Sequence, residues 1–270
     1  MAVTNQDLFE QDALTPDVLE LLGPRLSEVV AVAESGDRQR LRRAEKKWAA
    51  AAVDHLDIDI ACSGLGNINE RPYVIAPLHE GFADVLAVMS LPPALTWVIR
   101  DELLDLPYFG LYLKAAEHIA VEPESPRSAL RRILGDARQA ITSGESLVVF
   151  PQGSLLGLDI GFQTGAFRLA ERFRLPLLPI VLTGSHRVWE YPFSPKLRYH
   201  QKIRMEILEP IDGAHAVARM REIERDMKQR ALAVDDAPAR RYVPDRDGRW
   251  EGYSFLVDPD FPEVARAAGR

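Results

Sequence analysis

Short apolar runs, each long enough for one buried strand, recur through the middle of the chain and are separated by segments with helical periodicity. The runs are rich in branched side chains and are bounded by Pro, Gly or charged residues, which is typical of buried strands. They span residues 73–79, 95–99, 118–121, 146–150 and 177–182. Between them, residues 125–143 place Leu130, Ile133, Leu134 and Ile141 on one face, which predicts an amphipathic helix. This alternation predicts an α/β fold with a mainly parallel central sheet and helices on its faces.

The regions that flank this alternation have patterns of their own. Residues 15–53 predict a pair of helices, and the break at residues 35–37 supplies Asp37 as an N-cap for the second helix. Residues 55–62 and 202–208 alternate between polar and apolar side chains, as half-exposed strands do.

The last part of the chain predicts one more helix and a tail. Residues 214–232 have a helical pattern with mixed charges, and residues 246–249 (RDGR) carry a hairpin turn signal. We therefore expect three parts along the chain. They are an N-terminal helical segment packed on the core (1–54), the α/β domain (55–234) and a C-terminal tail with a hairpin (235–270).

The composition limits the class of protein. With 270 residues, 47% of them hydrophobic, the chain is large enough to bury a full core. A formal net charge of -7 argues against a general nucleic-acid binder. The single cysteine, Cys62, excludes an intrachain disulfide and suits a reducing compartment.

Two further features bear on localisation. The N-terminus lacks the basic and apolar segments of a signal peptide, and no apolar run approaches the roughly 20 residues of a membrane span. We expect a cytoplasmic protein, with peripheral contact to a membrane left open. The second helix carries six basic residues, which predict either a solvated face or a surface for anionic lipid or an acidic carrier protein. They are Arg38, Arg40, Arg42, Arg43, Lys46 and Lys47.

The residues with the clearest chemical potential stand at the ends of two predicted strands. His79 ends the run at 73–79, and Asp84 follows five residues later. If a helix begins near Gly81, the Asp84 carboxylate can reach one ring nitrogen and leave the other free to take a proton from a hydroxyl or an amine. This pair would be the base and orienter of a triad whose nucleophile is the acceptor substrate. The alternative is a capping or structural histidine.

The order of motifs along residues 55–210 resembles the glycerolipid acyltransferase superfamily, typified by the bacterial 1-acylglycerol-3-phosphate acyltransferases. The family block N-H-x-S-x-x-D is matched by His79 and Asp84 in residues 79–84 (HEGFAD). The later blocks also occur in the family order. P-x-x-G and I-x-V-D-R resemble residues 107–110 (PYFG) and 119–123 (IAVEP), F-P-E-G-T-R resembles 150–155 (FPQGSL), F-K-x-G resembles 162–165 (FQTG), and V-P-x-x-P resembles 175–179 (LPLLP).

The resemblance implies an acyltransferase mechanism. His79 would deprotonate the acceptor, Asp84 would orient His79, and the acceptor would attack an acyl thioester carried by CoA or by an acyl carrier protein. No bound cofactor and no metal is expected. The resemblance also implies that Gln152, Gly153, Ser154 and Gln163 bind substrate, and backbone donors near Gly153 and Ser154 could stabilise the oxyanion.

Several departures from the family motifs bear on the acceptor. The D-R pair of the second block is replaced by Glu122 and Pro123, and three further positions are neutral: Gln152, Leu155 and Gln163. In the family, the cationic positions are linked to the acceptor phosphate. A phosphate dianion without cations in a partly desolvated pocket would cost roughly several kcal/mol. We therefore expect an acceptor without a phosphate, either a small molecule or a lipid. Arg127 is a possible compensation that would keep lysophosphatidic acid as the alternative acceptor.

Two other classes of function stay in view. A hydrolase that uses Ser154 is poorly supported, because residues 153–157 (GSLLG) do not form the G-x-S-x-G of a nucleophile elbow. A non-catalytic relative that binds acyl carrier protein or lipid would have no need for both His79 and Asp84. The remaining histidines are expected to be structural or surface residues.

Overall fold

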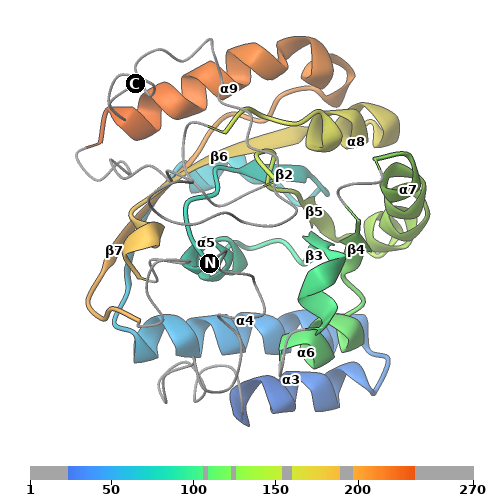
Figure 1. Cartoon of the computed structure of the whole chain (residues 1–270), viewed down its shortest axis with the longest axis vertical. Helices are drawn as coiled ribbons and strands as arrows, with labels where there is room; N and C mark the ends of the chain where they lie inside the picture. Colours follow the sequence, from blue (N-terminus) through green and yellow to red (C-terminus); the bar gives the residue numbers. More distant parts are fainter. Residues whose placement is uncertain (1–23, 106–108, 123–125, 154–159, 189–196, 235–270) are drawn as a thin grey trace, which may run out of the picture.

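A seven-stranded sheet forms the centre of the molecule, with the strand order β1-β7-β6-β2-β5-β3-β4 (Figure 1). The computed structural model describes residues 24–105, 109–122, 126–153, 160–188 and 197–234. The strands are β1 (Asp59–Ser63), β2 (Val74–Pro77), β3 (Leu95–Arg100), β4 (Ile119–Val121), β5 (Ser146–Val148), β6 (Leu177–Thr183) and β7 (Lys202–Ile207).

The sheet is mainly parallel, as the sequence predicts. Strands β6, β2, β5, β3 and β4 run in one direction, and β1 pairs with β7 in parallel. β7 pairs with β6 in the antiparallel sense, so β7 and β1 run opposite to the other five strands. The carboxyl ends of β2, β5 and β6 therefore meet at one edge of the sheet, where ligands bind in open α/β folds.

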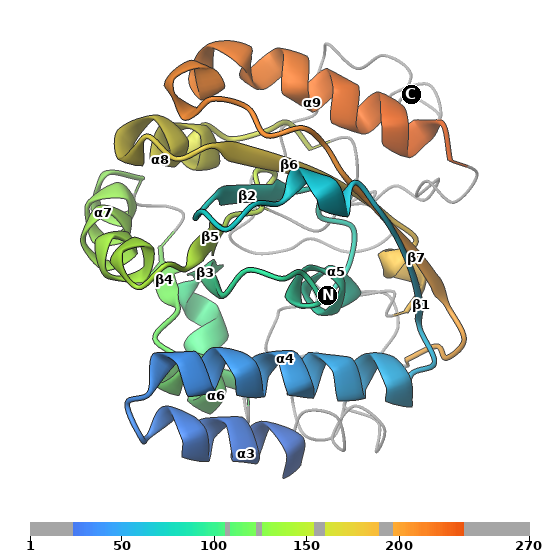
Figure 2. The ribbon, with the colours of Figure 1, turned by 180° about the vertical axis from the view of Figure 1, so that it is seen from behind.

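Helices cover both faces of the sheet (Figures 1 and 2). One layer contains α3 (Pro24–Ala33), α4 (Arg38–His55), α5 (Ala83–Met89) and α6 (Phe109–Ala115). The other contains α7 (Pro126–Thr142), α8 (Gly165–Phe173) and α9 (Ala216–Leu232). The mainly parallel sheet flanked by helices confirms the predicted fold class.

Strand β2 lies in the middle of the sheet because it has no polar face. Its residues Val74 and Ala76 pack into the core under α8 and α9, while Tyr73 and Ile75 belong to the core on the side of α4 and α5. All four are fully buried. A strand that is apolar on both sides is stable only between two helical layers.

The structure refines the predictions for the N-terminal helices. Asp37 caps α4 as predicted, because its side chain accepts a hydrogen bond from the backbone N–H of Arg40 at 2.9 Å. Helix α4 continues to His55, so the following strand begins at Asp59 rather than at residue 55. The first turns of the first predicted helix, before residue 24, and the hairpin of the tail lie outside the described residues.

Two of the six basic residues of α4 do not form the predicted solvated or lipid-facing surface. Arg42 is 3% exposed, and its guanidinium binds Glu45 and Glu145 at 2.9 and 3.1 Å. Arg38 binds Glu145 as well, at 2.9 Å. These side chains turn inward because they form ion pairs with buried carboxylates. A pattern of charges along one helix does not show where such partners lie.

None of the helices within the described ranges combines the length and the apolarity that crossing a membrane requires.

Candidate active site

Adjacent parallel strands bring the two predicted strand ends together. β2 pairs with β5, with Ile75 opposite Val148. The chain therefore reaches His79 beyond β2 and Gln152 beyond β5 at the same edge of the sheet. A hydrogen bond of 2.6 Å from the backbone N–H of His79 to the side-chain oxygen of Gln152 joins the two segments.

His79 and Asp84 are in direct contact. The Nδ1 atom of His79 lies 2.8 Å from Oδ2 of Asp84, which stands in the first turn of α5 and is fully buried. The same Oδ2 accepts the backbone N–H groups of Glu80 and Gly81 at 2.7 and 3.0 Å. These donors fix the carboxylate, so the imidazole has one orientation with its Nδ1 toward Asp84 and its Nε2 on the far side of the ring.

Aromatic rings support the imidazole from one side. The ring of Phe150 stacks on His79 with a centroid distance of 3.8 Å and an interplanar angle of 13°. Phe150 in turn stacks on Trp97 of β3 at 6.0 Å. Three neighbouring strands thus contribute one continuous aromatic surface, which leaves the His79 side chain 14% exposed. Such a surface excludes water from one face of the ring and suits an apolar substrate chain.

Gln152 occupies the position of the family glutamate and has a structural task. It is 3% exposed, and its amide oxygen is the acceptor for the N–H of His79. The sequence predicts substrate binding by Gln152, which stays a prediction; the structure adds the hydrogen bond to the loop that carries His79.

The other predicted substrate-binding residues are only partly described. The backbone N–H of Gly153 donates to the carbonyl of Phe150 at 3.1 Å, within the turn that follows β5. Gln163 has an exposed side chain, and its backbone N–H binds the carbonyl of Pro151 at 2.7 Å. Ser154 and the side chain of Arg127 lie outside the described part of the structure.

A second imidazole and carboxylate lie beside the first pair, and the sequence analysis missed them. The buried Glu80 side chain accepts the N–H of Gly184 at 3.0 Å, and the same Oε2 atom lies 3.4 Å from Nδ1 of His186. Burial raises the pKa of Glu80 to about 7; the hydrogen bond from His186 opposes this rise, and the charge of Asp84 adds to it. The sequence signal was a third apolar strand, β6, that ends in Gly, Ser and His (184–186).

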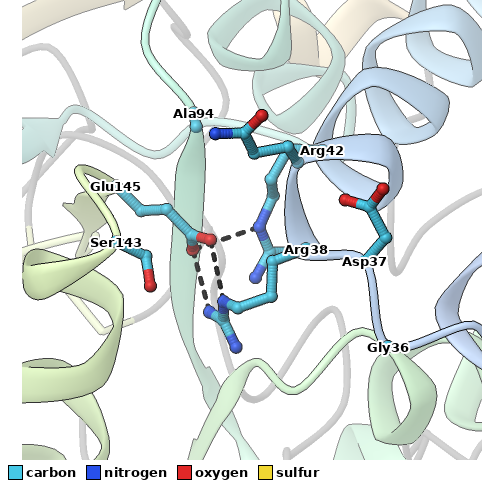
Figure 3. Close-up of a pocket in the computed structure, with 8 residues that line it drawn as sticks. Gly36, Asp37, Arg38, Arg42, Ala94, Ser143 and Glu145 are labelled. Atoms are coloured by element: carbon cyan, nitrogen blue, oxygen red, sulfur yellow. Dashed lines mark hydrogen bonds and ion pairs between the residues drawn. The ribbon is translucent and has the colours of Figure 1, made fainter.

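A cavity of about 400 Å³ lies at the opposite edge of the sheet (Figure 3). Arg38, Arg42 and Glu145 form ion pairs on its wall, and Ala94 and Ser143 line it near the amino ends of β3 and β5. Because its charged groups neutralise one another far from His79, we do not place the chemistry there. Within the described ranges, no group of three or more His, Cys, Asp or Glu side chains could hold a metal ion.

His79, oriented by a carboxylate, lies at the carboxyl end of a central parallel strand. Comparison with known proteins points to acyltransferases. Residues 59–183 match the family model described as Acyltransferase. The family model and the acyltransferase names of similar proteins support the glycerolipid acyltransferase superfamily for this part of the chain, as the order of motifs predicts.

Similar proteins carry names from phospholipid synthesis. A "1-acyl-sn-glycerol-3-phosphate acyltransferase" of Cocos nucifera is 33% identical over 114 residues, covering 41% of this chain and 37% of that protein. A protein of the same name from Pseudomonas aeruginosa is 28% identical over 146 residues, covering 53% and 54% of the two chains. The chain thus spans between about a third and a half of the length of these curated relatives.

The fold has a counterpart among solved structures. The crystal structure of the 1-acyl-sn-glycerophosphate (LPA) acyltransferase PlsC from Thermotoga maritima superposes with a TM-score of 0.58 and 20% sequence identity. The match covers 74% of this chain and 84% of that chain. At this identity the likeness shows the fold alone.

Proposed function

We propose that the protein is an acyltransferase that moves an acyl group from a thioester donor to an acceptor hydroxyl, with His79 as the general base and Asp84 as its orienter. The observation that carries this proposal is the 2.8 Å contact between His79 Nδ1 and Asp84 Oδ2 at the carboxyl edge of the sheet, within the residues that match the Acyltransferase model. A histidine with a purely structural role needs neither a buried carboxylate on Nδ1 nor a position at the carboxyl edge of the sheet.

The reaction follows from the orientation of the imidazole. His79 Nε2 takes the proton of the acceptor hydroxyl while the oxygen attacks the thioester carbonyl, and Asp84 stabilises the imidazolium that forms. When the tetrahedral intermediate collapses, the carbon–sulfur bond breaks and the imidazolium proton passes to the leaving thiolate. The products are an ester and a free thiol, and the base is regenerated without a cofactor.

The acceptor best supported by the comparisons is a 1-acylglycerol 3-phosphate. The relatives from Cocos nucifera and Pseudomonas aeruginosa are named for this substrate. A lysophospholipid acceptor also suits the ring of Phe150, which stacks on His79 and offers an apolar wall beside the base.

An acceptor without a phosphate is the second candidate, and the sequence favours it at particular positions. Leu155 and Gln163 are neutral where the family motifs F-P-E-G-T-R and F-K-x-G carry a cation. A phosphate has fewer cationic partners here than the family motifs would supply.

The test is an assay of the purified full chain with radiolabelled acyl-CoA and, in parallel, an acylated carrier protein. Each donor is offered with 1-acylglycerol 3-phosphate, with the matching monoacylglycerol and with a long-chain amine. We expect ester formation with 1-acylglycerol 3-phosphate as the preferred acceptor. Preference for the monoacylglycerol would establish the second candidate, and the absence of transfer to all three would contradict the proposed function.

A further inference from the structure

Glu80 and His186 repeat, on the neighbouring strand, the arrangement of Asp84 and His79. Each imidazole has its Nδ1 against a buried carboxylate, and each carboxylate also accepts backbone N–H groups. The two pairs are physically joined, because Glu80 donates its own N–H to Asp84. His186 follows β6, which pairs in parallel with β2, so both imidazoles lie at the same edge of the sheet.

The loop that contains Gly81 and the turn that contains His186 are in close backbone contact. A Cβ atom added to Gly81 would lie 2.9 Å from both N and Cα of His186. The glycine therefore allows the loop after His79 to touch the turn after β6. The surroundings are polar as well as buried: within the described ranges, four buried side-chain oxygens there have no hydrogen-bond partner. They are Glu80 Oε1, Asp84 Oδ1, Thr183 Oγ1 and Ser185 Oγ.

The imidazole of His186 is the member of this group that can meet a ligand. Its side chain is 25% exposed, whereas that of Glu80 is fully buried. Within the described residues, its recorded polar partner is Glu80, on Nδ1, and Nε2 is the ring nitrogen left for a ligand. The Glu80 carboxyl lies against Nδ1 and orients the ring, so Nε2 is on its far side.

We propose that His186, oriented by Glu80, contacts the phosphoryl group of the acceptor. This proposal rests on the proposed function and deepens it, since it supplies a cationic donor for the phosphate in a chain whose Leu155 and Gln163 are neutral where the family motifs carry a cation. Glu80 acts through His186 and is a positioning residue. The imidazolium would form a charge-assisted hydrogen bond with a phosphoryl oxygen while His79 addresses the hydroxyl.

The first arm of the test compares two acceptors that differ only in the phosphate. For His186→Gln, we expect the KM for 1-acylglycerol 3-phosphate to rise at least about tenfold and kcat to stay within about threefold, with no change in KM for monoacylglycerol. Glu80→Gln should change KM in the same selective way. The control is His215→Gln, an exposed histidine before α9, which should alter neither value. Equal losses for both acceptors, or no loss, would overturn the proposal.

The second arm needs no enzymatic activity. Protein labelled with ¹³C at the histidine ε1 carbon is titrated with glycerol 3-phosphate, and the His186 signal is assigned by its loss in His186→Gln. We expect this signal to shift and saturate, and the His215 signal to stay in place. A stationary His186 signal would refute the contact even if the wild type transfers acyl groups. A saturating shift in a protein that transfers none would refute the proposed function and keep the phosphate contact.

Discussion

At the scale of single residues, the position of the base depends on backbone donors as much as on Asp84. The N–H of His79 is bound by Gln152, and the next two N–H groups are bound by Asp84. All three donors in this turn are thus satisfied by side chains rather than by a helix. Loss of one acceptor would leave a buried N–H without a partner, at a cost of about 1–3 kcal/mol.

Substitution of Gln152 separates this positioning role from direct substrate binding. We expect Gln152→Ala to lower the free energy of unfolding by about 1–3 kcal/mol and to lower kcat about tenfold or more, because the turn of His79 loosens. Gln152→Glu, which keeps an oxygen at this place and restores the family residue, should retain activity within a few fold. Urea unfolding and steady-state kinetics provide both values. An inactive but fully stable Gln152→Ala would point to substrate contact instead.

The buried carboxyl of Glu80 makes stability depend on pH. Its pKa is raised to about 7 in the folded protein from 4.5, so the folded state holds the proton more tightly than the unfolded state. The contribution of this group to stability is therefore greatest below about pH 4.5, falls as the pH rises to 7, and is constant above that. From the two pKa values the change is on the order of 3 kcal/mol.

Glu80→Gln removes this titration. We expect the variant to gain stability relative to the wild type between pH 5 and pH 8, as measured by urea unfolding in a series of buffers. A difference in stability between the two proteins that is the same across this range would contradict the buried, proton-binding state of Glu80.

At the scale of elements, the loop before α5, which follows His79, is in close contact with the η3 turn (Ser185–Arg187), which carries His186. Gly81 makes this contact possible, since any side chain there would meet the backbone of His186. Two segments that approach so closely define the distance between the groups they carry.

Gly81→Ala tests this spacing. The added methyl forces the two segments apart, so we expect a fall in kcat/KM of about tenfold or more with a moderate loss of stability. Gly135→Ala is the matched control, because an added Cβ there has no atom within 4 Å and the residue lies inside α7. It should be neutral or stabilising by up to about 1 kcal/mol. Equal activity of the two variants would show that the spacing is unimportant.

Helix α4 is fastened to the sheet by buried charges. Arg42 binds Glu45 and Glu145, and Tyr112 and His118 complete the hydrogen bonding of Glu45. Burial opposes the ionisation of Glu45, but the hydrogen bond and charge of His118, together with Arg42, outweigh it and hold the pKa of Glu45 below its usual value. Removal of the cation would leave carboxylates buried without their partner.

We therefore expect Arg42→Met to cost about 3–5 kcal/mol in thermal or urea unfolding. Arg43→Met, the exposed neighbour on the same helix, should change stability by less than about 0.5 kcal/mol. Because the network lies at the amino edge of the sheet, the folded fraction of Arg42→Met should retain its kcat. A stable Arg42→Met would show that the ion pairs are dispensable.

At the scale of the whole molecule, the sequence predicted what depends on local pattern. Short apolar runs predicted strands β2, β5 and β6, and the helical spacing of apolar residues predicted helix α7. The contact between His79 and Asp84 was predicted from their separation of five residues along the chain. The reversed direction of β7 was not predicted, because it depends on which neighbour a strand pairs with, a choice made across the whole sheet.

Contacts between distant segments explain the remaining differences. Glu80 meets His186 across 106 residues, and Arg42 meets Glu145 across 103. In the sequence, His186 is one of six histidines and Arg42 is one of six basic residues on a helix, so nothing local distinguishes them. The role of an ionisable side chain depends on how deeply it is buried and on which charged group it contacts. Both are set by the fold rather than by the neighbouring sequence.

The central claim is that His79 is the base of an acyl transfer. The most direct measurement is the rate of ester formation from acyl-CoA and 1-acylglycerol 3-phosphate by His79→Gln, with His215→Gln as a folded histidine control. We predict that His79→Gln keeps its unfolding transition and loses about 10²–10⁴-fold in kcat, while the control matches the wild type. Transfer at the wild-type rate by a well-folded His79→Gln would contradict the account.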